Sequence, residues 1–320
     1  MSNNVLVLAG RVGKDITEAT YELIGAARAL ASAWGGQVEV ALFGTADPAK
    51  DLGAADTVIS IDHPALSDYV PEAYETALRA VVAERAPRVV LLPNDTMGLD
   101  LGTAVSVHWE AAQAAYVVGL TADGETLVAT CQILGGKILA ECEITGPRAV
   151  CTVAAGAFPA AAGQGGDGAE LVTMDPPAGL DSARMSLLAL IEPSGGDVDI
   201  TQAELLVSVG RGIGSKDDLD TVQELADALG APLSASRPVI DAGWMPKSRQ
   251  VGKSGLKVKP KAYLSFGISG APEHLEGMRD AELIIACNTD AAAPIFDVAH
   301  FGTTADLFDL VPAIVEKLEG

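Results

Sequence analysis

A glycine-rich segment, Gly210-Arg-Gly-Ile-Gly214, follows the apolar run Leu205–Val209 and precedes a helical pattern. A turn of this kind between a strand and a helix lets backbone N–H groups and the helix N-terminus face a phosphate. The segment lacks the full GxGxxG spacing, and many such turns are only tight connections. On its own the segment therefore fits a phosphate-binding turn and a simple connecting turn equally well.

A basic island lies between Lys247 and Lys261, where six cations occur without an acid in a chain of formal net charge −22. Such a loop can be a solvated surface, and it can also hold a pyrophosphate or a reduced flavin. Within it, Gly252-Lys253-Ser254 resembles the end of a Walker A loop. Lys247 stands where that loop needs its leading glycine, so we expect no ATP binding through it.

Two more polar loops follow predicted strands in the same half of the chain. Gly267–His274 comes after Tyr263–Phe266, and Asn288-Thr-Asp290 comes after Leu283–Ala286. A lone histidine is more often structural, and Asn and Asp are routine turn formers and helix caps, as is Asp306 before the last helical pattern. Together, however, these loops occupy the carboxyl ends of successive strands, where open α/β sheets bind nucleotides. We therefore expect one nucleotide crevice in the C-terminal half.

The elements that must position these loops follow an α/β pattern, because apolar runs alternate with helical spacing. We expect two domains, each a mostly parallel sheet flanked by helices. The first half predicts strands at Val5–Leu8, Val38–Leu42 and Val89–Leu92, and helices at Ile16–Ala33 and Tyr74–Glu84. Three further runs divided by glycines predict hairpins added to the same domain: Leu127–Ile133, Lys137–Ile144 and Ala149–Val153.

The alternation restarts after the Pro/Gly/Asp stretch Pro193–Asp199, and we place a domain boundary near residue 195. An N-terminal α/β domain then spans residues 1–194, and a doubly wound nucleotide-binding domain spans residues 195–320. The second domain predicts strands at Leu205–Val209, Tyr263–Phe266 and Leu283–Ala286, and helices at Lys216–Leu229 and Asp306–Leu318.

Composition excludes several classes of function. The acidic balance argues against nucleic-acid binding, whose surface would be basic. The four cysteines, Cys131, Cys142, Cys151 and Cys287, are widely spaced without a CxxC pair, so we expect buried thiols and no metal site. No apolar run approaches 18 residues and no targeting segment is visible, so we expect a cytoplasmic protein without membrane insertion.

Seven segments, in order and spacing, resemble the electron-transfer flavoprotein alpha-subunit family. The likeness is dense over residues 205–313, and the first 190 residues agree more loosely, through strand order and Pro93–Gly102. The segments are Ser208–Ser215, Ala235–Trp244, Gln250–Gly255, Gly267–His274, Asn288–Asp290, Ala293–Phe296 and Asp306–Phe308.

The resemblance implies an alpha subunit that binds FAD in its C-terminal domain and packs its N-terminal domain against a beta subunit. That beta subunit would carry AMP or a second FAD. Arg237 is implied to lie over the isoalloxazine ring, Ser254 to offer its hydroxyl to N5, and His274 to approach the N1/O2 edge. The implied FAD site comprises Arg211, Ser236, Arg237, Gln250, Val251, Gly252, Lys253, Ser254, Ser269, Gly270, Ala271, Pro272, Glu273, His274, Asn288, Asp306 and Leu307.

Cations at such a site would determine which one-electron reduction step of the flavin is favourable. A flavin that takes up one electron without a proton becomes an anion with charge concentrated at N1/O2. A unit charge ~4 Å away, at an effective dielectric near 20, interacts by roughly 4 kcal/mol, equivalent to about 170 mV before screening. Arg237 keeps its charge at all relevant pH values, whereas we expect His274 to titrate near neutral pH.

The chain departs from the family pattern at three places. Lys253-Ser254 replaces Gln-Thr, which keeps the hydroxyl and adds a cation. Pro272-Glu273 replaces Ile-Gln, which stiffens the loop and adds an acid. Thr289 replaces a lysine, so a cation is lost there.

Three functions are compatible with the sequence. The first is an electron carrier, not an enzyme, that takes single electrons from acyl-CoA-type dehydrogenases of fatty acid β-oxidation and passes them to a membrane quinone oxidoreductase. The alternative is the alpha subunit of an electron-bifurcating flavoprotein that oxidises NADH through a second FAD in beta. The third is a nucleotide-binding or assembly subunit without redox activity, which would be colourless.

Overall fold

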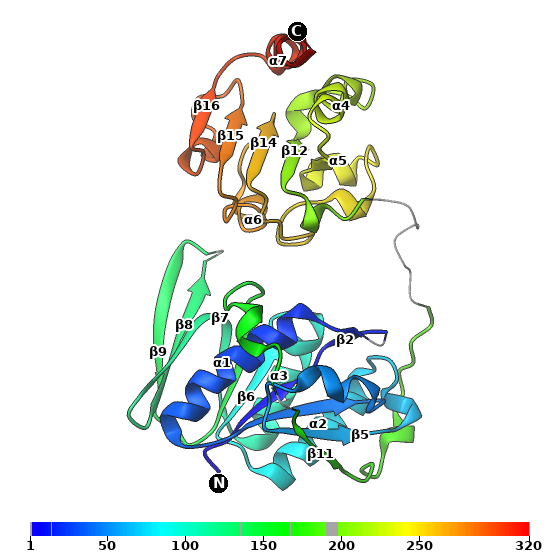
Figure 1. The fold of residues 1–320 in the computed structure, drawn as a ribbon, viewed down its shortest axis with the longest axis vertical. Helices are drawn as coiled ribbons and strands as arrows, with labels where there is room; N and C mark the ends of the chain where they lie inside the picture. The colour runs from blue at the N-terminus through cyan, green and yellow to red at the C-terminus, as the bar shows by residue number, and fades with distance from the viewer. Residues whose placement is uncertain (1, 14, 135, 167, 190–197, 320) are drawn as a thin grey trace. The chain divides into compact units, whose positions relative to one another are not determined.

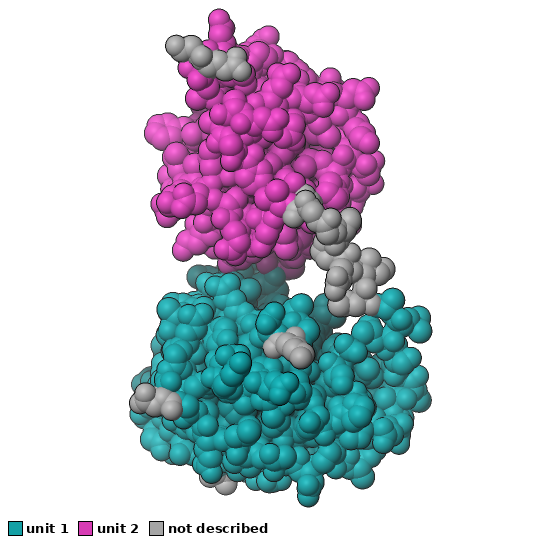
Figure 2. Space-filling view, turned by 45° about the vertical axis from the view of Figure 1, so that its right-hand side comes forward, with its two compact units in different colours: residues 1–190 teal, residues 191–320 magenta. Residues whose placement is uncertain are grey.

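The computed structural model describes residues 2–13, 15–134, 136–166, 168–189 and 198–319. The chain divides into two compact units, residues 1–190 and 191–320 (Figure 2). The boundary predicted near residue 195 falls within 190–197, outside the described residues. Both units are α/β with mainly parallel sheets flanked by helices, which confirms the predicted fold class.

Unit 1 contains a nine-stranded sheet in the order β11-β5-β4-β1-β6-β10-β7-β8-β9 (Figure 1). Every neighbouring pair from β11 to β7 is parallel, whereas β7–β8 and β8–β9 are antiparallel. A separate two-stranded ribbon pairs β2 with β3. The strands are β1 Val5–Leu8, β2 Arg11–Val12, β3 Asp15–Ile16, β4 Val38–Phe43, β5 Thr57–Ile61, β6 Val89–Pro93, β7 Ala112–Asp123, β8 Thr126–Ile133, β9 Ile138–Ile144, β10 Ala149–Val153 and β11 Glu170–Thr173.

Helices cover both faces of this sheet, because its central strands are apolar on both sides. Val5 and Val7 of β1 belong to the core that includes α1 (Glu18–Trp34). Leu6 and Leu8, which point the other way, belong to the core that includes α2 (Pro71–Arg85) and α3 (Thr96–Trp109). None of the described helices has the length and apolarity needed to cross a lipid bilayer.

Two predictions for unit 1 are wrong. Ala149–Val153 is no hairpin strand: as β10 it lies between β6 and β7 and is parallel to both, because the chain returns from the edge strand β9 to the middle of the sheet. Cys142 is exposed rather than buried, because it lies on β9, which pairs on one side only.

Unit 2 contains a five-stranded, wholly parallel sheet in the order β13-β12-β14-β15-β16. Val207 and Val209 of β12 pack with α4, α5 and α7, and Leu206 packs on the opposite face, so the sheet is covered on both sides. The strands are β12 Leu205–Val209, β13 Leu233–Ala235, β14 Ala262–Phe266, β15 Ile284–Cys287 and β16 Phe301–Thr303, and the helices are α4 Leu219–Ala228, α5 Arg237–Asp241, α6 Pro272–Leu275 and α7 Leu307–Glu319.

Short 3-10 helices complete the connections in both units. Several of them position loops at strand ends, including Arg211–Ile213 directly after β12 and Lys247–Arg249 in the basic island. They span Asp47–Leu52, Pro64–Leu66, Ala160–Gly163, Leu180–Ser182, Ile200–Gln202, Arg211–Ile213, Lys247–Arg249 and Pro294–Asp297.

Candidate functional site

The strand order of unit 2 reverses between β12 and β14. The chain runs from β12 outward to β13 and then returns to β14 on the other side, so the loops after β12 and β14 leave the sheet in opposite directions. Open α/β sheets bind ligands in the crevice that such a reversal creates at the carboxyl ends of the strands. A cavity of about 870 Å³ lies there, lined by residues that directly follow β12, β13, β14 and β15. Its size falls within the range of small-molecule and cofactor sites.

The cavity brings together most of the residues that the sequence singled out. It also includes four residues that the implied FAD-site set leaves out: Gly212, Pro238, Gly267 and Ile268. All four lie in segments that the sequence analysis singled out, Gly210–Gly214, Ala235–Trp244 and Gly267–His274, so the segments were the available signal. The predicted residues that line the cavity are Arg211, Ser236, Arg237, Gln250, Val251, Gly252, Lys253, Ser254, Ser269, Ala271, Glu273, His274 and Asn288.

Four predicted site residues do not line this cavity. Gly270 lies in the turn before α6, and Pro272 is the first residue of that helix. Asp306 accepts a hydrogen bond from the backbone N–H of Phe308 at 3.0 Å, at the start of α7. Leu307 is buried in the hydrophobic core of unit 2. Their contribution to ligand binding stays a prediction.

The turns after β12 and β14 are in direct backbone contact. The Gly212 N–H donates to the carbonyl of Gly267 at 3.0 Å, and the Gly210 N–H donates to Phe266 at 2.9 Å. A Cβ atom at Gly212 would lie 2.7 Å from the Cα of Gly267, closer than real Cβ contacts allow. Glycine at position 212 therefore lets two loops meet and form one wall of the cavity from backbone, as phosphate-binding turns require.

Arg237 begins α5 and lines the cavity with its neighbours Ser236 and Pro238. Its guanidinium Nε lies 3.1 Å from the Asp241 carboxylate, one helical turn further along. Both side chains are well exposed, so the pair is only weakly stabilising and leaves the Arg237 charge available to a ligand.

A hydrogen-bond network orients the Ser254 hydroxyl. Lys247 Nζ donates to Gln250 Oε1 and to the Ser254 carbonyl, both at 2.7 Å. An ammonium can only donate, so Lys247 holds the oxygen of the Gln250 amide on its own side. The amide nitrogen of Gln250 then donates to Ser254 Oγ at 2.9 Å. Because this bond uses the hydroxyl as an acceptor, the Ser254 proton is left to donate to another group.

The basic island is partly neutralised by acids from other segments. Three of its cations form ion pairs: Lys253 with Glu276 at 3.7 Å, Lys257 with Asp280 at 3.1 Å, and Lys261 with Glu204 at 2.8 Å. Of these cations, only Lys253 lines the cavity. The local field at the site is therefore weaker than a count of six cations suggests.

His274 lines the cavity as a buried, neutral group. Only 6% of the residue is exposed, and its Nε2 lies 2.9 Å from the hydroxyl of Tyr263. Burial lowers the pKa of His274 to about 4, and the Val251 backbone opposes this effect to a smaller extent. The expectation that His274 titrates near neutral pH is therefore wrong, because desolvation disfavours its charged form. The other nitrogen, Nδ1, is buried and makes no hydrogen bond of good geometry with any described residue.

Asn288 ties the loops after β14 and β15 together. Its side-chain amide donates to the Ile268 carbonyl at 2.9 Å, and its oxygen accepts from the Asp290 N–H at 3.0 Å. Asp290 in turn accepts from the Ala292 N–H at 2.9 Å. Both residues thus act as the turn formers that their types suggest, and Asn288 also fixes a loop that lines the cavity.

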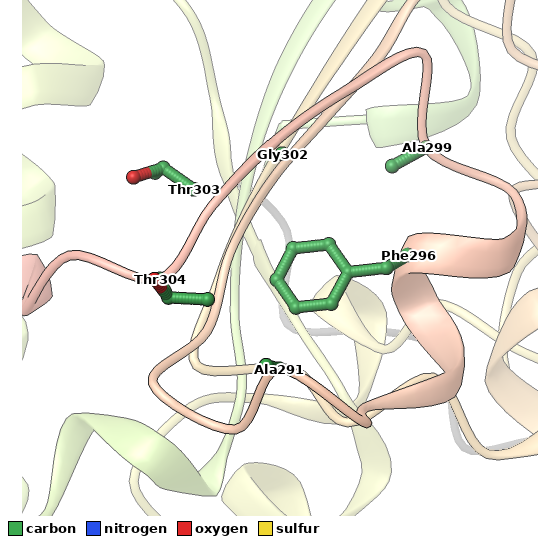
Figure 3. Close-up of a pocket in the computed structure, with 6 residues that line it drawn as sticks. All are labelled: Ala291, Phe296, Ala299, Gly302, Thr303 and Thr304. Atoms are coloured by element: carbon green, nitrogen blue, oxygen red, sulfur yellow. The ribbon is translucent and has the colours of Figure 1, made fainter.

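A second, smaller cavity lies beside β16. The Phe296 ring points into it from one side and the Gly302–Thr304 segment borders it on the other (Figure 3). Its described lining contains no charged side chain, so we place the candidate site in the larger cavity. The lining residues are Ala291, Phe296, Ala299, Gly302, Thr303 and Thr304.

The larger cavity suits an anionic ligand such as the expected flavin nucleotide. Backbone of the Gly212 and Gly267 turns can approach a phosphate closely, and Arg211, Arg237 and Lys253 supply positive charge. His274 lines the same cavity as a neutral ring and adds no charge to it.

Comparisons with known proteins agree with this arrangement. Residues 5–178 match the family described as Electron transfer flavoprotein domain, and residues 199–279 match Electron transfer flavoprotein FAD-binding domain. The chain is 36% identical over 325 residues to electron transfer flavoprotein subunit alpha of Methylophilus methylotrophus, with 99% of each chain covered.

Two further relatives carry different names. The chain is 35% identical to acryloyl-CoA reductase electron transfer subunit beta of Anaerotignum propionicum, covering 97% of this chain and 93% of that protein. It is 34% identical to lactate dehydrogenase (NAD(+),ferredoxin) subunit LctC of Acetobacterium woodii, covering 99% of this chain and 77% of that protein.

Proposed function

The chain belongs to the electron transfer flavoprotein alpha-subunit family, and from this premise we propose that it is an electron carrier working as one half of a heterodimer. It takes single electrons from acyl-CoA-type dehydrogenases and passes them to an acceptor such as a membrane quinone oxidoreductase. The family's FAD-binding domain occupies residues 199–279, and bound FAD supplies the one-electron chemistry.

The observation that carries this proposal is the set of groups converging on the cavity at the carboxyl ends of β12 and β14. Arg237 brings a permanent positive charge, and Ser254 brings a hydroxyl with a free proton. Both groups favour added negative charge on a neighbouring ligand. A site of this kind stabilises a cofactor that gains an electron, and it needs no nucleophile or general base.

We further propose that the two units have different roles. Residues 195–320 hold FAD, and residues 1–194 pack against a beta subunit that carries AMP or a second FAD. The match of the first unit to a separate family domain and the name "subunit alpha" of the relative from Methylophilus methylotrophus support this division.

A second candidate function is electron bifurcation, in which NADH is oxidised through a second FAD in beta. The relative from Acetobacterium woodii favours it, because its name couples NAD(+) to ferredoxin and the similarity covers 99% of this chain and 77% of that protein. The FAD site proposed here serves both functions, so the choice depends on the flavin content of the partner.

Co-expression of the chain with the product of a neighbouring beta-subunit gene, followed by extraction of bound nucleotides, tests both proposals. One FAD with one AMP per heterodimer supports the carrier, and two FAD molecules support bifurcation. A colourless heterodimer that takes up no FAD would contradict both and favour a subunit without redox activity.

A further inference from the structure

Lys253 forms an ion pair with an acid that lies outside the larger cavity. Its ammonium Nζ is 3.7 Å from Glu276 Oε2, and the two side chains are 44% and 23% exposed. Lys253 lines the cavity together with its neighbours Gly252 and Ser254, whereas Glu276 is not among the lining residues. The flexible stem of Lys253 therefore begins at the cavity wall, and its charge lies beside a carboxylate that is not part of that wall.

The backbone segments that carry this ion pair are in direct contact. The Lys253 N–H donates to the carbonyl of Glu273 on α6 at 2.7 Å. A Cβ atom at Gly277, the residue after Glu276, would lie 2.4 Å from the backbone nitrogen of Gly252, closer than real Cβ contacts allow. The loop that carries Lys253 is therefore packed against the end of α6. The position of the Lys253 charge is then set by its side chain and not by movement of the loop.

An anionic ligand in the cavity competes with Glu276 for the Lys253 ammonium. FAD carries negative charge on its pyrophosphate, and a partly solvated ion pair is weak enough for a bound anion to compete with it. Other charges make this competition matter, because Glu273 is an acid that lines the cavity and Arg237 is itself paired with an acid outside it. The share of the Lys253 charge that reaches the ligand therefore affects both its affinity and its readiness to accept an electron.

We propose that Glu276 is a positioning residue that holds the Lys253 ammonium away from the FAD, and thereby lowers both the affinity for FAD and the potential at which bound FAD accepts an electron. The naming of FAD as the ligand rests on the proposed function. Lys253 then differs in role from Lys247, whose ammonium donates to the Gln250 side chain and to the Ser254 carbonyl. Lys247 orients groups at the site, whereas Lys253 supplies a charge that Glu276 limits.

A double-mutant cycle in the full-length chain, co-purified with its beta subunit, tests the proposal. Glu276→Gln is expected to tighten FAD binding about two- to fivefold, the range of one partly exposed ion pair, and to raise the potential of the bound FAD. In a Lys253→Gln background the same substitution should change neither quantity appreciably, because the ammonium that Glu276 holds is gone. FAD titration of the apoprotein and anaerobic redox titration measure the two effects, and the gain in affinity should shrink at high ionic strength.

Asp280→Asn is the matched control, because Asp280 pairs with Lys257 of the basic island at 3.1 Å and neither residue lines the cavity. It removes the same charge and should leave FAD affinity and potential close to the wild-type values. Unchanged affinity and potential in Glu276→Gln overturn the proposal. An equal effect of Glu276→Gln in both backgrounds, or an equal effect of Asp280→Asn, also overturns it, because the acid would then act on the ligand without Lys253.

Failure of the wild type to bind FAD contradicts the proposed function instead. Inorganic pyrophosphate then replaces FAD as the titrated anion, and the same comparison of the two backgrounds decides the role of Glu276.

Discussion

Arg237 and Asp241 face each other across one turn of α5, with the guanidinium Nε 3.1 Å from the carboxylate. Arg237 lines the cavity, and Asp241 does not. An anion bound in the cavity and the Asp241 carboxylate therefore compete for the same positive charge. The effective charge that Arg237 presents to a cofactor depends on how strongly Asp241 screens it.

Arg237→Ala is expected to lower the potential at which bound FAD accepts its first electron while FAD stays bound. Because Arg237 is two-thirds exposed and paired, we expect a fall of some tens of millivolts, below the roughly 170 mV of an unscreened charge ~4 Å away. Asp241→Asn should raise the same potential. Arg237→Lys keeps the positive charge and should leave the potential close to the wild-type value. Anaerobic redox titration measures all three, and a potential that none of them moves would remove Arg237 from the flavin environment.

Ser254→Ala is expected to lower the same potential by about 20–60 mV, the equivalent of one lost hydrogen bond of 0.5–1.5 kcal/mol. Ser254→Thr keeps the hydroxyl and serves as the control. Lys247→Met should shift the potential in the same direction by a smaller amount, because the Gln250 amide loses the ammonium that orients it. A visible spectrum and titration of Ser254→Ala identical to wild type would show that this hydroxyl does not reach the flavin.

Gly212→Ala is expected to destabilise unit 2 by about 1–3 kcal/mol and to reduce FAD content, because the added methyl group meets the Gly267 backbone. Gly146→Ala is the control: nothing lies within 4 Å of a Cβ at that exposed position. Urea unfolding and the flavin-to-protein absorbance ratio measure the two effects. Equal stability of both variants would mean that the two turns can separate without cost.

Acid is expected to destabilise unit 2 through His274. Its folded-state pKa of about 4 lies below the ordinary value of about 6.5, so the unfolded chain binds a proton first as the pH falls. Stability is then lost progressively from about pH 6.5 to pH 4, by about 3 kcal/mol in total, and this group causes no further loss below that.

The measurement is urea unfolding at pH 7 and pH 4.5, followed by the fluorescence of Trp244 in a chain with Trp34 and Trp109 replaced by Phe. These three are all the tryptophans of the protein, and Trp244 is the one in unit 2. His274→Gln should flatten the pH dependence, while His108→Gln, at an exposed site in unit 1, should leave it unchanged. Equal pH dependence in all three proteins would place the acid sensitivity elsewhere.

Periodicity alone predicts the strongly apolar strands of this fold. Val5–Leu8 and Leu205–Val209 match β1 and β12 at both ends, because strands buried on both faces are almost wholly apolar, with Ser208 the one polar residue of the two. Three-residue strands and a glycine-containing helix escaped prediction. β13 and β16 have three residues each, and α3 contains Gly98 and Gly102, residues that argue against a helix. Gly98 is needed because a Cβ there would lie 1.7 Å from the carbonyl oxygen of Pro93.

The candidate site was also predictable only in part. Its location follows from loops at successive strand ends, which sequence order reveals, and most of the residues named from the family likeness line the cavity. The electrostatic state of those residues does not follow from sequence. His274 is neutral because of burial, Lys253 is paired with Glu276, and Arg237 is paired with Asp241. Each depends on a contact that only the folded chain creates.

The exposed thiol on the edge strand β9 has a practical consequence. Cys142 is accessible, whereas Cys131, Cys151 and Cys287 are buried and burial raises the pKa of each. A maleimide dye should therefore attach at a single point in unit 1, without any engineered cysteine. The FAD-binding domain lies in unit 2. Energy transfer from the flavin's own fluorescence to that dye would therefore report changes in the distance between unit 1 and unit 2 during electron transfer.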